Sequence, residues 1–149
     1  MGTKDRLADA LKEAMRDRDA ITKSTLRMTL SAIKLAEVDE GGELEESALL
    51  AVVQRQVKSR QETIRDAVKA GRSDLEAEAQ AEIEILQQFL PQPLSAADLE
   101  NLAWETINQV GAESPAEMGK VMQALMPKVQ GQADGAEVSR LVRRLLQGP

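Results

Sequence analysis

The chain has 149 residues, of which 25 are acidic and 19 basic, so its formal net charge is −6. This charge excludes a protein that coats nucleic acid through bulk positive potential, although a local basic face remains compatible with it. Because there is no cysteine and no histidine, we expect no metal site, no cofactor and no self-contained active site built on thiolate or imidazole chemistry.

The first part of the chain is predicted to form four helices. Abundant Ala, Leu, Glu, Gln, Lys and Arg, with one Phe, one Trp and no Tyr, favour helices over sheets. Thr3 is the expected cap of the first helix, and Gly71 is the expected stop of the third. Ser73 and Glu76 have the spacing of a capping box for the fourth. The predicted ranges are about 5–18, 20–38, 45–70 and 73–90.

A proline pair then interrupts the helical pattern. Pro91 and Pro93 push the residues before them out of the helical region, so we expect a hinge at this point. Three shorter helices follow, with start signals at Ser95, at Ser114 with Pro115, and at Asp134. The sequence therefore predicts an all-α protein, with a four-helix domain over residues 1–92 and a three-helix bundle over residues 93–149.

The second predicted helix is apolar on several sides and carries a narrow basic strip. We expect such a helix to be buried among its neighbours, with the strip as its only window to solvent. Two interpretations remain: ordinary solubilising charge, or a groove for an anion or an acidic partner. The strip consists of Lys23, Arg27 and Lys34.

Two charged residues fall on apolar helical faces. Arg60 lies near the middle of the apolar face of the third helix, and Glu82 lies among apolar residues of the fourth. Because a lone buried charge is costly, we predict that Arg60 and Glu82 meet, with Glu37 as an alternative partner for Arg60. We interpret the pair as a structural ion pair that fixes helix register rather than as a catalytic dyad.

The last predicted helix turns three arginines outward together: Arg140, Arg143 and Arg144. Such a set can hold phosphates bidentately, although cations also favour a helix C-terminus without any ligand. Lys120 and Lys128 are the other basic residues of this half of the chain. Trp104 is expected to be partly exposed, either to stack on a base or to contact the other half of the protein.

The compartment is predicted from the absence of apolar targeting and spanning signals. The sequence contains no stretch of about 18 uncharged apolar residues, so it predicts no transmembrane helix. Its first residues do not form an apolar signal core. We therefore expect a soluble, cytoplasmic protein that does not engage a membrane.

Five short motifs, spread in order over almost the whole chain, resemble the GatB/YqeY family. They are Ser24-Thr25-Leu26-Arg27-Met28, Gly41 to Leu44, Leu90 to Ser95, Met118 to Met122 and Gly131 to Gly135. The chain resembles the stand-alone YqeY-like members. Its second half is similar to the C-terminal tail of the B subunit of the glutamyl/aspartyl-tRNA amidotransferase.

This resemblance implies an all-α structure in two parts and a link to tRNA, because the B-subunit tail engages tRNA away from the chemical centre. The candidates that it implies are Gly119, Lys120, Gly131, Gln132 and the surface of the final helix. Gln132 is a departure, since the family commonly has a basic residue there, and one phosphate contact is therefore expected to be weakened or lost. Nothing in the sequence resembles the separate catalytic region of the B subunit.

Three functions follow from these observations. The first is an accessory module that contacts tRNA or a tRNA-processing partner, with modest and salt-dependent affinity, because residues from Leu94 onward hold five basic and seven acidic side chains. The second is a carbon–nitrogen ligase with glutamine as amide donor, acting only with partner subunits, because no activated nucleophile or phosphate loop is present. The third is a helical protein–protein adaptor.

Overall fold

The computed structural model describes residues 2–148 and confirms the all-α class. Over these residues it contains seven α-helices and a short 3₁₀ turn, and no strand. The chain divides into two compact units, Met1–Pro91 and Gln92–Pro149. This division falls one residue before the boundary expected from the proline pair.

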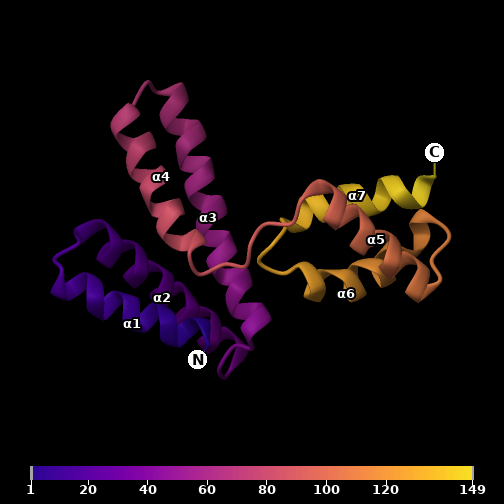
Figure 1. The fold of residues 1–149 in the computed structure, drawn as a ribbon, viewed down its shortest axis with the longest axis horizontal. Helices are drawn as coiled ribbons and strands as arrows, with labels where there is room; N and C mark the ends of the chain where they lie inside the picture. The colour runs from indigo at the N-terminus through magenta and orange to yellow at the C-terminus, as the bar shows by residue number, and fades with distance from the viewer. Residues whose placement is uncertain (1, 149) are drawn as a thin grey trace. The chain divides into compact units, whose positions relative to one another are not determined.

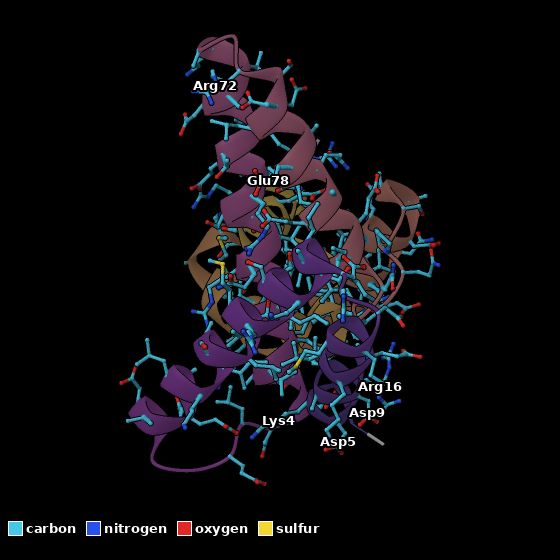
Figure 2. The ribbon with its side chains drawn as sticks, turned by 90° about the vertical axis from the view of Figure 1, so that its left-hand side faces the viewer. Lys4, Asp5, Asp9, Arg16, Arg72 and Glu78 are labelled. Atoms are coloured by element: carbon cyan, nitrogen blue, oxygen red, sulfur yellow. The ribbon has the colours of Figure 1, made fainter. Side chains whose placement is uncertain are left out.

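The first unit consists of two antiparallel helix pairs (Figure 1). Helices α1 (Thr3–Arg16) and α2 (Ala20–Glu40) form one pair, and α3 (Glu46–Lys69) and α4 (Ser73–Gln87) form a long hairpin. Arg72 lies at the tip of this hairpin, where its guanidinium binds the carboxylate of Asp74 (Nη2–Oδ2, 2.9 Å; Figure 2). The two pairs share one core, which includes Leu7, Leu26, Ile33, Leu49, Val53, Val57, Ile83 and Leu86.

Two predicted caps in the first unit are wrong. Thr3 is buried inside the first turn of α1, and Gly2 takes the cap position. The Thr3 hydroxyl and backbone N–H both donate to the carboxylate of Glu46, which joins α1 to the start of α3. Ser73 is likewise the first residue of α4 rather than its cap, because Arg72 occupies that position. At α1, a long-range contact with Glu46 thus replaces the local cap.

The second unit is a three-helix bundle of α5 (Ala96–Val110), α6 (Met118–Val129) and α7 (Gly135–Gln147). All three helices begin at their predicted start signals, with Ser95 and Asp134 in the cap positions of α5 and α7 and Ser114 at the turn before α6. The hydroxyl of Ser95 accepts the N–H of Asp98 at 3.1 Å, and Ser114 and Glu117 form a complete capping box around the 3₁₀ turn Pro115–Glu117. The core includes Leu99, Ala103, Ile107, Val121, Leu125, Val129, Val138 and Val142.

None of the helices that the structure describes between residues 2 and 148 is long and apolar enough to cross a membrane.

Candidate nucleic-acid interface

The outer face of α7 carries the three predicted arginines. The opposite face of this helix is apolar, and Val138, Val142, Leu145 and Leu146 are buried in the core of the second unit. Because those residues fix the rotation of the helix about its axis, the arginines must point outward. Arg140, Arg143 and Arg144 are all exposed. We call these three residues the arginine face.

The guanidinium groups of the arginine face have no counter-ion among the residues that the structure describes. Within the described part of the chain, no carboxylate lies within the 4.0 Å of an ion pair from Arg140, Arg143 or Arg144. Each guanidinium offers five N–H donors in a planar fork that matches a phosphate. The face therefore presents three uncommitted cations, which can each bind a phosphate without first breaking an internal pair.

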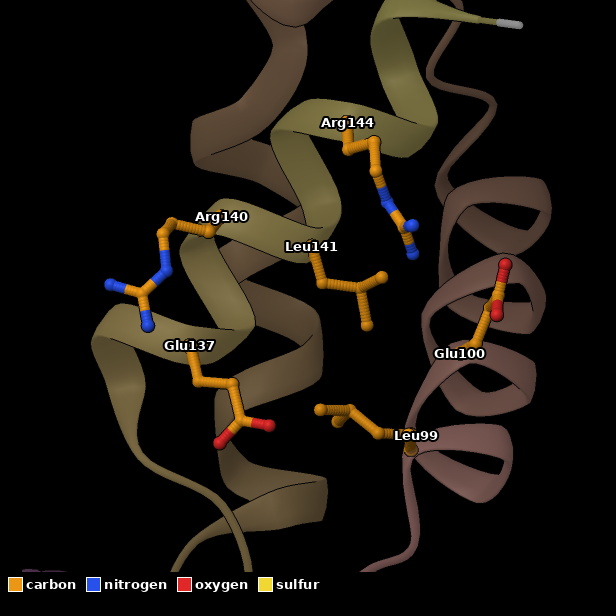
Figure 3. Close-up of a pocket in the computed structure, with 7 residues that line it drawn as sticks. Leu99, Glu100, Glu137, Arg140, Leu141 and Arg144 are labelled. Carbon is orange, nitrogen blue, oxygen red and sulfur yellow. The ribbon is translucent and has the colours of Figure 1, made fainter.

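A cavity of about 310 Å³ lies between α5 and α7, next to the arginine face (Figure 3). Leu99 and Leu141 supply apolar surface. Arg144 extends past Leu141 toward α5, whereas Arg140 points away from α5. Glu100 and Glu137 bring negative charge to the same cavity. Its lining residues are Ala96, Leu99, Glu100, Glu137, Arg140, Leu141 and Arg144. The cavity can accept an apolar or planar group whose ends carry both donors and acceptors.

The two lysines of the second unit are already engaged. Lys128 is exposed, but its ammonium donates to the Thr106 hydroxyl at 3.2 Å and to Gln109 Oε1 at 2.9 Å. Lys120 lies 3.9 Å from the carboxylate of Glu117. Backbone N–H groups of the capping turn, with Lys120 as a smaller cause, hold the pKa of Glu117 below its usual value. Both lysines are thus weaker candidates for a phosphate contact than the arginine face.

Of the remaining residues implied by the resemblance, Gly131 and Gln132 organise the backbone and Gly119 does not. Gly119 is exposed with open space around it, and Gly131 is buried with a positive φ of 82°, a conformation that favours glycine. Gln132 holds the segment that leads into α5: its side-chain amide donates to the carbonyl of Gln92 at 3.1 Å, and its carbonyl accepts the N–H of Leu94 at 3.2 Å. No sequence signal pointed to this role of Gln132.

The basic strip of α2 is present, but it is not the only exposed part of that helix. Arg27 and Lys34 are exposed and Lys23 is half-buried. The structure also exposes Met28 and Leu35, whose side chains were expected to be covered. The prediction fails because α2 packs on the three other helices of its own unit through one side, around Leu26 and Ile33, and the first unit has no further helix for the other side.

The structure brings Arg60 and Glu82 together inside the first unit. Arg60 Nε lies 3.5 Å from Glu82 Oε2, and Arg60 Nη1 donates to the backbone carbonyl and Oε1 of Gln56, both at 3.0 Å. The alternative partner, Glu37, instead binds Lys4 at 2.8 Å and accepts the N–H of Leu44. These two contacts, led by the hydrogen bond from Lys4, lower the pKa of Glu37.

The fold and the arginine face define a small all-helical protein of two units whose second unit ends in an exposed cationic helix. The sequence model of the family described as "Yqey-like protein" matches residues 4–146. The chain therefore belongs to this family.

Several fungal proteins are similar to the chain, and they are named "Altered inheritance of mitochondria protein 41, mitochondrial". The protein from Lachancea thermotolerans is 37% identical over 91 residues, which cover 60% of this chain and 49% of that protein. The protein from Pyrenophora tritici-repentis is 26% identical over 144 residues, which cover 95% and 79%. The chain thus spans about half the length of the Lachancea relative.

These relatives overturn the predicted cytoplasmic localisation, because their names place them in mitochondria. The physical reason is that the prediction rested on the absence of apolar signals. A folded helical domain meets the same solvent in any aqueous compartment, so its composition does not distinguish one such compartment from another.

Proposed function

We propose that this protein is an accessory module that contacts tRNA through the arginine face of its second unit. The observation that carries the proposal is the set of three exposed guanidinium groups, none of which has a counter-ion among residues 2–148. Phosphate contacts of this kind position a protein on nucleic acid without reading its sequence. The cavity between α5 and α7 adds a place beside these phosphate contacts for one unstacked base.

The resemblance to the family also supports a contact with tRNA. The second half of the chain resembles the tail of the amidotransferase B subunit, a tail that engages tRNA, and the arginine face lies on the last helix of that half. The second unit nevertheless carries a net charge of −2 from Leu94 onward. Binding is therefore modest in affinity and depends strongly on salt.

An unaided carbon–nitrogen ligase has less support. Hydrolysis of glutamine requires an activated nucleophile, and without Cys or His that role falls to Ser or Thr. The residues that line the α5–α7 cavity include no hydroxyl group and no lysine. A role in amide transfer accordingly requires the catalytic groups of partner subunits, with this chain as the module that holds the tRNA.

The experiment that tests the proposal is fluorescence anisotropy with labelled total tRNA at low and moderate salt. We expect saturable binding by the wild type and a loss of about tenfold or more when the whole arginine face is changed to Ala. The matched control removes three exposed cations of α3 in the first unit: Arg55, Arg65 and Lys69. An equal loss in this control, or no binding by the wild type at low salt, contradicts the proposal.

A second variant separates phosphate geometry from charge. Replacement of the arginine face by three lysines keeps the charge but removes the planar fork of donors. We expect an affinity between those of the wild type and the alanine variant. Full recovery would assign the effect to charge alone.

A further inference from the structure

The first unit leaves an unpartnered apolar stripe on α2. Ile21, Met28 and Leu35 are 45%, 55% and 65% exposed, and they follow one another at intervals of seven residues. Residues with this spacing lie on one line along a helix. The sulfur of Met28, near the end of the side chain, lies 4.0 Å from Nη2 of the buried Arg60, while the residue as a whole remains 55% exposed.

The stripe belongs to a wider pattern that matches one half of a two-helix seam. In heptad terms, Ile21, Met28 and Leu35 occupy position a, and Ser24, Ser31 and Val38 occupy position d. Both serines are exposed, and Val38 is 70% exposed. Large and small side chains thus alternate along the surface, and a second helix can place its own large residues over the serines.

A basic edge runs along one side of this surface. Arg27 and Lys34 occupy the two g positions that flank the seam, and both are exposed. Neither side chain has a carboxylate within ion-pairing distance among the residues that the structure describes. Charges at g positions select the partner helix and its orientation, so this edge favours a partner with Asp or Glu facing it.

A second copy of the chain matches this surface less well. In an antiparallel pairing the g positions of the two helices face each other, which places the cations of both copies side by side. In a parallel pairing each g position faces the residue five further along the partner helix, so Arg27 would face Ala32. Only Lys34 would meet an acidic residue, Asp39.

We propose that the exposed face of α2 docks an amphipathic helix of another protein, one with apolar seam residues and acidic residues along the edge that faces Arg27 and Lys34. The pattern of apolar, small and cationic residues carries this proposal, and it stands independently of the arginine face. The first unit thereby acts as a protein-docking module, which gives the adaptor interpretation of the basic strip a specific surface and a specific partner chemistry.

The test uses the full chain, labelled with ¹⁵N, and two synthetic helical peptides of about 20 residues. Both peptides carry Leu and Ala at the seam positions. One has Glu and the other Lys at the flanking positions. We expect the Glu peptide to shift the amide signals of residues 21–38 and to bind about tenfold or more tightly than the Lys peptide.

Variants of residues on the exposed face of α2 locate the effect. The pair Arg27→Glu and Lys34→Glu should reverse the preference, so that the Lys peptide binds more tightly. The pair Met28→Ser and Leu35→Ser should weaken both peptides by about tenfold or more. The control pair, Val68→Ser and Lys69→Glu, changes an exposed apolar residue and a cation on α3 and should leave binding unchanged.

Three results would overturn the proposal. The first is equal binding of the two peptides, or the absence of binding by either peptide. The second is a set of shifted signals outside α2. The third is concentration-dependent broadening of the α2 signals of the chain alone, reversed by Met28→Ser and Leu35→Ser, which would make a second copy the occupant.

Discussion

The guanidinium of Arg60 and the carboxylate of Glu82 join α3 to α4, with Nε and Oε2 3.5 Å apart. Their side chains are 7% and 19% exposed, so the pair lies at the edge of the core of the first unit. Two hydrogen bonds to Gln56 satisfy Nη1 of the same guanidinium, whereas Nε has Glu82 as its nearest charge. Both residues therefore compensate the burial of the Arg60 guanidinium inside the unit.

Loss of Glu82 should destabilise the first unit. Glu82→Ala leaves a nearly buried cation without its counter-ion, and we expect the free energy of unfolding in urea to fall by about 1–3 kcal/mol. The double change Arg60→Met with Glu82→Leu removes both charges and should restore most of that loss. If the double variant is less stable than Glu82→Ala, the pair is not the source of the destabilisation.

Acid should weaken the contact between Lys4 and Glu37. The folded protein lowers the pKa of Glu37 from its usual 4.5, mainly through the hydrogen bond from Lys4. The contribution of Glu37 to stability is therefore present above about pH 4.5 and is lost as the pH falls through the lowered value. Glu37→Gln should remove this part of the pH dependence of the unfolding temperature. Glu84→Gln, a change of an exposed carboxylate on α4, should leave the dependence as it is.

Gln132 should control the order of the segment that leads into α5. Gln132→Ala removes the side-chain hydrogen bond to Gln92, and we expect faster hydrogen exchange at the amide of Leu94, with a change of no more than about 1 kcal/mol in global stability. Gln123→Ala changes an exposed glutamine of α6 and serves as the control. Unchanged exchange at Leu94 would show that the backbone bond to Gln132 suffices.

Trp104 should report on binding at the second unit. It is the only tryptophan of the chain, is 42% exposed, and follows Glu100 of the cavity lining by one turn of α5. We expect tRNA to quench its fluorescence and the alanine variant of the arginine face to lose this response at the same tRNA concentration. Quenching that persists in that variant would place the tRNA on another surface.

Much of the fold could be predicted from local patterns, because caps and helical periodicity act over a few residues. Ser95 and the Ser114–Glu117 box start their helices as their spacing indicates, and the anomalous charges at Arg60 and Glu82 pointed to each other. Contacts between distant segments were missed. No local rule shows that Thr3 will be buried against Glu46 rather than serve as a cap.

The same distinction between local patterns and contacts of distant segments applies to the functional surfaces. The outward direction of Arg140, Arg143 and Arg144 follows from the apolar face of α7 alone. The exposure of Met28 and Leu35 could not be predicted, because it depends on how many helices surround α2 and not on α2 itself. The engagement of Lys128 by Thr106 and Gln109 likewise depends on the register between α5 and α6.

The salt dependence of tRNA affinity tests the central claim most directly. Each phosphate neutralised contributes about −0.9 to the slope of log K against log salt concentration. If the three residues of the arginine face bind phosphates, their replacement by Ala should make the slope less negative by about 2 to 3. An unchanged slope, with affinity that falls equally at all salt concentrations, would contradict the claim that these arginines contact the RNA backbone.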